Sequence, residues 1–86
     1  MIKKYKKKSI IIEAIQYIGN NFEEVSSFVG QPLLHYINTY EDNNALGIPT
    51  FNSIIKASIG DYIIRDELND YYSCKPDIFK VTYDEI

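Results

Sequence analysis

Residues 60–83 constrain the fold more than any other stretch of this chain. Two short β-prone runs, residues 62–65 and 71–74, are separated by a polar turn, and this arrangement is typical of a β-hairpin. Pro76, followed by an aspartate, comes directly after the second run. Proline at the first helical position has a preset φ and loses no hydrogen bond, so it favours a helix start there. The stretch therefore predicts a hairpin that leads into a short helix.

Residues 9–18 predict another strand, because β-branched and aromatic residues dominate them. Apolar residues occur at both alternating positions, and this pattern favours a central strand that is covered on both faces. Alternation places Gln16 on the face of Ile10, Ile12 and Ala14, and Tyr17 on the other. Since buried polar groups need partners, we expect Gln16 either to bond to a neighbouring backbone or to line a pocket.

Residues 22–29 predict a short helix, since Phe22, Val25 and Phe28 recur at helical spacing and acidic residues occupy the first turn. Gly30 is expected to end it. Three further strands are predicted at residues 33–40, 46–51 and 53–57. Pro49 should push the second of these towards an edge or a bulge, because proline cannot donate a backbone hydrogen bond.

The length of 86 residues indicates one domain with a modest core. We expect a basic N-terminal segment at residues 1–8 and a single small α+β domain at residues 9–86. Its predicted fold is a strongly twisted, mainly antiparallel sheet of about five or six short strands with two short helices. One cysteine, Cys74, and one histidine, His35, permit no intrachain disulfide and no metal-ligand cluster. Self-association is the remaining way to stabilise so small a core, and we expect a homo-oligomer.

The charge is distributed unevenly along the chain. Five of the nine basic residues lie at positions 3–8, so residues 9–86 carry four basic and 12 acidic side chains, a net charge of −8. This acidic body opposes nucleic-acid binding, and the lysine-rich start is more simply explained as a solubilising segment. No secretory signal and no apolar run of about 20 residues is seen. With an unpaired cysteine, these features favour the cytoplasm and exclude a membrane partner.

Both ends of the sequence resemble a family of small phage and prophage proteins. The C-terminal resemblance is carried by the pattern Gly60-Asp61-Tyr62-Ile63-Ile64-Arg65, then Tyr72-x-Cys74-Lys75-Pro76-Asp77-Ile78-Phe79 and Thr82-Tyr83. The N-terminal resemblance is carried by Lys4-Tyr5-Lys6-Lys7-Lys8 and Glu13-Ala14-Ile15-Gln16-Tyr17. The turn at residues 66–70 lacks the family's glycine, and residues 31–58 show no resemblance. The resemblance implies a phage-encoded accessory protein in the host cytoplasm, and it implies no reaction.

The inventory of reactive side chains argues against an enzyme. Cys74 and His35 have no spacing that would join them as a nucleophile and base. Cys74 precedes a predicted helix start, which could lower the pKa of a thiol, but a small apolar residue at a strand end explains it equally well. The four glycines form no phosphate-binding loop. We therefore expect no catalytic residue, no metal site and no cofactor.

Binding is the remaining class of function. The leading hypothesis is a phage counter-defence protein that sequesters a small nucleotide-derived immune signal, stoichiometrically and as a homo-oligomer. The alternative is an inhibitor that docks on a host defence protein, such as a nuclease effector, through an acidic, tyrosine-rich surface. Tyr62 and Arg65 should point to opposite faces by alternation. The same residues also have a simpler interpretation, in which the tyrosines cap the core and the cations pair with nearby acids. The candidate ligand-binding residues are Gln16, Tyr17, Tyr62, Arg65, Tyr72 and Lys75.

Overall fold

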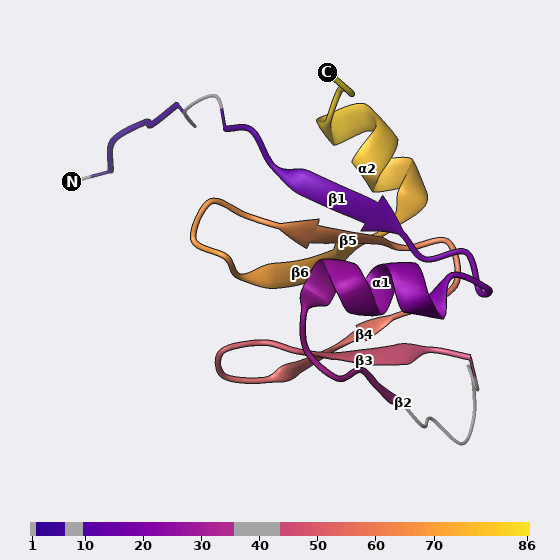
Figure 1. The fold of residues 1–86 in the computed structure, drawn as a ribbon. Helices are drawn as coiled ribbons and strands as arrows, with labels where there is room; N and C mark the ends of the chain where they lie inside the picture. The colour runs from indigo at the N-terminus through magenta and orange to yellow at the C-terminus, as the bar shows by residue number, and fades with distance from the viewer. Residues whose placement is uncertain (1, 7–9, 36–43) are drawn as a thin grey trace.

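The chain forms a single small α+β domain, as predicted. The computed structural model describes residues 2–6, 10–35 and 44–86, and part of the strand predicted at 33–40 lies outside this range. The elements follow one another as β1 (Glu13–Gln16), α1 (Phe22–Val29), β2 (Leu34–His35), β3 (Leu46–Pro49), β4 (Ile54–Ala57), β5 (Tyr62–Arg65), β6 (Tyr71–Cys74) and α2 (Pro76–Thr82) (Figure 1).

The described strands form two antiparallel sheets of three strands each, where one sheet was expected. Sheet A has the order β1-β5-β6 and sheet B the order β2-β3-β4. The two sheets meet where β4 lies against β6. The turn between β4 and β5 carries the chain from one sheet to the other; in it the Asp61 N–H donates to the Ser58 carbonyl at 2.9 Å. The predicted hairpin is therefore confirmed as β5 and β6, and β5 is the central strand of sheet A.

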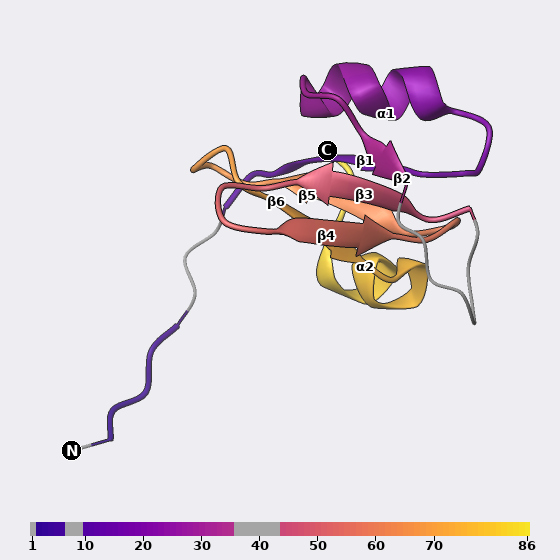
Figure 2. The same cartoon turned by 90° about the horizontal axis from the view of Figure 1, so that it is seen from below.

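The position of β1 corrects the sequence interpretation, because β1 is an edge strand and pairs only with β5 among the described strands. Apolar residues occur on both of its faces because helices lie on both sides of sheet A, as Figure 2 shows. Face coverage and position in a sheet are separate properties, and alternation in the sequence reports only the first.

The prediction that Pro49 would place its strand at an edge is also wrong, because β3 is the central strand of sheet B. Pro49 is the last residue of β3 and pairs with Ile54 of β4. On the other side, β2 pairs with β3 only at Leu46 and Gly47. The nitrogen of Pro49, which carries no hydrogen to donate, therefore points to the β2 side of β3, where no described strand lies opposite Pro49.

The faces of sheet A follow from its register. Ile15 of β1 lies opposite Ile63 of β5, and both pack towards α1; we call this side the α1 face. Ala14 lies opposite Ile64, which in turn lies opposite Tyr72, on the other side, which we call the α2 face. Both Ile63 and Ile64 are fully buried, because β5 is covered from both sides.

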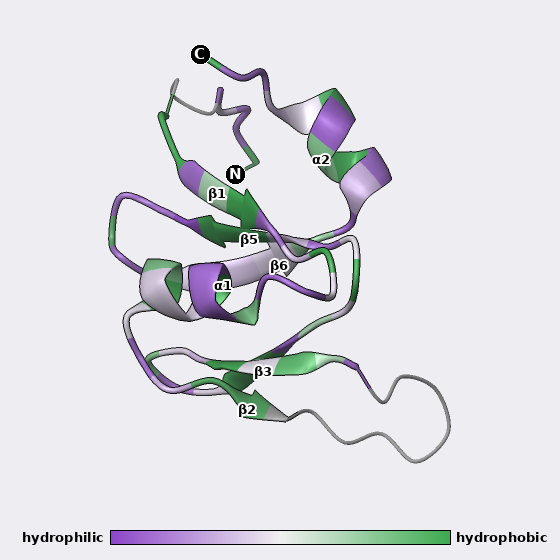
Figure 3. Cartoon of the chain, turned by 45° about the vertical axis from the view of Figure 1, so that its right-hand side comes forward, coloured by the Kyte–Doolittle hydropathy of each residue, from purple (hydrophilic) through white to green (hydrophobic). Residues whose placement is uncertain are grey.

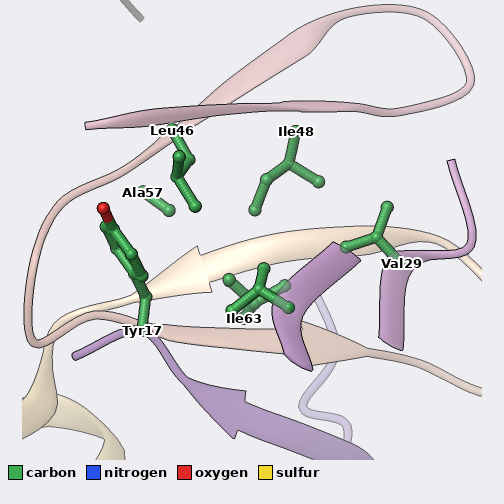
Figure 4. Close-up of a cluster of buried hydrophobic side chains, with 7 residues drawn as sticks. Tyr17, Val29, Leu46, Ile48, Ala57 and Ile63 are labelled. Carbon is green, nitrogen blue, oxygen red and sulfur yellow. The ribbon is translucent and has the colours of Figure 1, made fainter. Parts of the chain in front are cut away.

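The hydrophobic core lies between α1 and the two sheets. Helix α1 has the predicted bounds and ends at Gly30, whose φ of 74° is readily adopted by glycine. Its Val25 and Val29 are buried. Figure 4 shows core side chains of α1, sheet A and sheet B pointing towards one another, and Figure 3 shows the hydrophobic colouring concentrated on strands such as β5 and β3. The buried cluster comprises Tyr17, Val25, Val29, Leu46, Ile48, Ala57 and Ile63.

Candidate functional site

Two adjoining hollows lie on the α2 face of sheet A, and together we call them the α2 groove. Their volumes are about 360 and about 700 Å³. Four residues line both hollows, from the stretch before β1 and from the end of α2: Ile10, Ile12, Thr82 and Tyr83. The groove thus lies between β1 and α2, which are neighbours in Figure 1.

The floor of the α2 groove is a continuous series of aromatic rings. Tyr62 of β5 stacks on Phe79 of α2, with ring centroids 3.8 Å apart and planes 5° from parallel. Phe79 contacts Tyr83 at a centroid distance of 5.0 Å. These two residues meet because positions four apart share one side of a helix. Tyr83 and Tyr72 of β6 both line the smaller hollow.

Tyr72 sits in an environment that disfavours its ionised form. Burial, followed by the interaction with the Tyr83 hydroxyl, raises the pKa of Tyr72 from 10.0 to about 12. Tyr72 is nevertheless 36% exposed, so part of its ring is accessible from the groove. The floor therefore offers neutral aromatic surface with hydroxyl groups at its margin.

The rim of the α2 groove is acidic. Asp66 and Glu67 lie at the smaller hollow, and Asp84 and Glu85 at the larger one. Among the described residues, no lysine or arginine lines either hollow. Four carboxylates around an apolar floor favour a ligand that carries positive charge beside apolar groups.

Two of the predicted site residues, Tyr62 and Tyr72, come together in the groove. Gln16 instead bonds to a neighbouring backbone, one of its two expected roles: its Nε2 donates to the Gly60 carbonyl at 3.1 Å. Tyr17 is a core residue, 4% exposed, and its hydroxyl donates to the Asn44 carbonyl at 2.7 Å.

Arg65 lies on the α1 face, so the predicted separation of Tyr62 and Arg65 is confirmed. Its Nη2 is 3.0 Å from a carboxylate oxygen of Glu13, and its Nη1 donates to the Phe28 carbonyl at 3.0 Å. The guanidinium also lies 4.5 Å from the centroid of the Phe28 ring. Hydrogen bonds to Tyr71 and then to Glu13 raise the pKa of Arg65 above its usual value. These contacts join β5 to α1 and β1.

Lys75 pairs with the one buried charged side chain in the described part of the chain. Its Nζ is 3.2 Å from Oδ1 of Asp61, and Asp61 is 4% exposed. Oδ2 of Asp61 accepts a hydrogen bond from the Ser58 N–H at 3.0 Å. The two cationic candidates, Arg65 and Lys75, therefore both have acidic partners outside the α2 groove. This agrees with the simpler interpretation of the sequence, in which the cations pair with nearby acids.

Sequence reasoning did not identify the other groove residues. In α2, Ile78 is 53% exposed, whereas Phe79 makes the ring contact with the sheet. Phe79 and Tyr83, four residues apart at a predicted helix, were the available signal for an aromatic stripe. Asp84 and Glu85 gave no signal, because two acids near a chain end are common.

Cys74 and His35 are the remaining side chains with potential reactivity. Cys74 is a free, half-buried cysteine at the end of β6, and its Sγ lies 3.6 Å from the Lys75 carbonyl. His35 is the last residue of β2. No group of histidine, cysteine or acidic residues within the described ranges could hold a metal ion.

No protein-family model matches the chain, and neither a curated protein nor a solved structure shows significant similarity to it. The resemblance to small phage proteins stays a prediction from the sequence. Residues 2–6, 10–35 and 44–86 contain no helix with the length and hydropathy needed to cross a bilayer. The geometry of the α2 groove is therefore the main indication of function.

Proposed function

We propose that this protein is a non-catalytic binding protein that docks on another protein through the α2 groove. The observation that carries the proposal is the aromatic floor, formed by Tyr62, Phe79 and Tyr83, beneath a rim of carboxylates. Aromatic side chains with a polar margin are typical of protein interfaces. The expected partner presents basic side chains beside apolar ones.

The charge of the groove favours this function over sequestration of a nucleotide. A phosphate group bound there would lie among Asp66, Glu67, Asp84 and Glu85, and like charges at such distances repel. Arg65 and Lys75, the two cations among the candidate ligand-binding residues, pair with Glu13 and Asp61 instead of facing the groove. The aromatic rings alone suit a base, but the rim does not suit its phosphates.

The sequence resemblance indicates what kind of partner to seek. A phage accessory protein with an acidic, tyrosine-rich docking surface would act in the host cytoplasm by occupying a basic surface of a host defence protein. Such a surface is expected where a defence protein, for example a nuclease effector, contacts nucleic acid. Inhibition would then be stoichiometric, and homo-oligomer formation stays a separate prediction.

Affinity purification with charge-reversal variants tests the proposal. The tagged protein is expressed in defence-proficient host cells, and the bound proteins are quantified against the bait. We expect one host protein at near-equal molar yield with the native chain. Changing Glu67 and Asp84 to lysine should remove it, because the rim then repels a basic partner.

Glu23→Lys is the matched control, since Glu23 is an exposed acid in the first turn of α1 and lies outside the groove. The same preparations are tested for thermal shifts with a panel of cyclic nucleotides and ADP-ribose derivatives. A stable shift with one of these nucleotides, and no host protein that depends on the rim carboxylates, would refute protein docking and restore the sequestration hypothesis.

A further inference from the structure

We infer that the partner binds the α2 groove as an extended strand that pairs with the open edge of β1. This inference rests on the proposed function and specifies how the groove holds its occupant. Its three supports are the free backbone groups of β1, the side chain that closes one end of that edge, and the position of the larger hollow along it.

The register of sheet A shows which backbone groups of β1 point outward. The Tyr17 N–H donates to the Asp61 carbonyl at 2.9 Å, and the Tyr17 carbonyl accepts from the Gly60 N–H at 2.7 Å. Tyr17 therefore bonds towards β5, and alternation assigns the same direction to Ile15 and Glu13. The backbone groups of Ile12 and Ala14 must then face away from β5, where the described chain provides no strand partner.

Asn21 closes the edge at its other end. Its Nδ2 donates to the Gln16 carbonyl at 2.8 Å, and its Oδ1 accepts from the Ile18 N–H at 2.9 Å. The amide thus occupies the place where a neighbouring strand would bond to Gln16 and Ile18. An added strand can pair with residues 10–14 and must stop before Gln16.

The larger hollow runs beside this open segment. Ile11 and Ile12 both line it, although side chains of consecutive residues in an extended chain point to opposite faces. A hollow that touches both therefore follows the edge of the strand rather than one face. Ile11 is 76% exposed, and on the far side the hollow is bounded by α2 and residues 84–86.

This arrangement defines the chemistry of the occupant. In an added strand, alternate side chains would face the Phe79 and Tyr83 rings, so apolar residues fit those positions. Positive side chains elsewhere in the strand can reach Asp84 and Glu85. The predicted ligand is a segment of another protein that alternates apolar and basic residues, bound mainly by backbone hydrogen bonds.

Synthetic peptides provide the probe. Short peptides that alternate valine with lysine are titrated against the full chain by fluorescence anisotropy, with valine–glutamate peptides as the charge control. Two further valine–lysine peptides carry backbone N-methyl groups, one at the valines and the other at the lysines. Because only alternate residues bond to β1, one N-methylated peptide should lose affinity about tenfold or more while the other binds normally.

Ala14→Pro tests the same edge from the protein side. Proline is tolerated at an edge strand where its nitrogen faces solvent, so the pairing with β5 should persist and the melting temperature should change little. The variant lacks the outward Ala14 donor and should bind the peptide at least about tenfold more weakly. If Ala14→Pro unfolds the chain, the two N-methylated peptides, which are titrated against the native chain, still test strand addition.

The outcomes separate this inference from the proposed function. Equal binding of both N-methylated peptides, together with a host partner that depends on Glu67 and Asp84, would refute strand addition and leave protein docking intact. If no peptide binds and no host protein is captured, both strand addition and protein docking are refuted. If the native chain is a dimer by light scattering, and Ala14→Pro makes it monomeric without any peptide binding, the edge serves a second copy and the inference is wrong.

Discussion

Asp61 offers the sharpest test of how the structure holds its functional elements in place. It lies in the turn that links sheet B to sheet A, and it is 4% exposed. One carboxylate oxygen accepts the Ser58 N–H at 3.0 Å, and the other lies 3.2 Å from the Lys75 Nζ just before α2. Removal of this carboxylate should therefore loosen the entry to β5 and the start of α2 together.

The expected cost follows from the two contacts. A hydrogen bond from a half-buried backbone N–H to a charged acceptor contributes about 1.5–3 kcal/mol. The ion pair contributes about 1 kcal/mol at most, because the Lys75 side chain is 60% exposed and water can replace its partner. Asp61→Ala should thus lower the free energy of unfolding by about 2–4 kcal/mol. Asp61→Asn keeps an acceptor for Ser58 and should cost about 1 kcal/mol.

Urea unfolding followed by circular dichroism measures these differences; the chain has eight tyrosines and no tryptophan, so tyrosine fluorescence is the second probe. With a denaturant slope of about 1 kcal/mol/M for a small domain, Asp61→Ala should lower the midpoint by about 2 M or more. A double-mutant cycle with Lys75→Met isolates the ion pair, and we expect a coupling below about 1 kcal/mol.

Two results would contradict this reasoning. An Asp61→Ala variant that unfolds at the native midpoint would show that the carboxylate does not support the turn. A Lys75→Met variant with unchanged stability but impaired partner binding would show that Lys75 serves a ligand rather than Asp61.

Three further predictions concern the two faces of sheet A. Because the pKa of Tyr72 in the folded chain, about 12, lies above its usual 10.0, the contribution of this one group to stability should be constant below pH 10 and fall as the pH rises from 10 to 12; Tyr72→Phe should remove this part of the decline in stability, measured by urea unfolding at each pH. Arg65→Lys should lower the melting temperature more than Glu13→Gln, because lysine cannot contact Glu13, the Phe28 carbonyl and the Phe28 ring together; an equal effect of the two changes would reduce Arg65 to a simple ion pair. Ile63→Ala, at a fully buried site, should cost about 2–5 kcal/mol in urea unfolding, and a cost below about 1 kcal/mol would place the core elsewhere.

The local elements were predictable because their signals lie close together in the sequence. The spacing of Phe22, Val25 and Phe28 with Gly30 after them located α1 with its observed bounds. Pro76 located the start of α2, and the polar turn at 66–70 located the hairpin. Each of these depends on propensities and capping over a few residues.

Arrangement in space was less predictable. The edge position of β1 depends on which strands pair with one another. A strand with both faces covered has the same sequence pattern at the edge of a sheet as at its centre. The α2 groove needs Ile10, Tyr62 and Phe79 to converge from distant parts of the sequence. Of the candidate residues, Tyr62 and Tyr72 line the groove. Tyr17 lies in the core instead, because its ring can be buried while its hydroxyl still forms a hydrogen bond.

The edge position of β1 also has a consequence for synthesis on the ribosome. Glu13 pairs with Arg65, which lies 52 residues later, so at 5–20 residues per second β1 waits about 3–10 s for its partner strand. The hairpin and α2, by contrast, can form as soon as they emerge, since their contacts are local. We expect β1 to join last, onto a preformed β5–β6–α2 unit. During this interval the isoleucines at 10–12 are unpaired, and the lysines just before them are well placed to keep the nascent chain from aggregating.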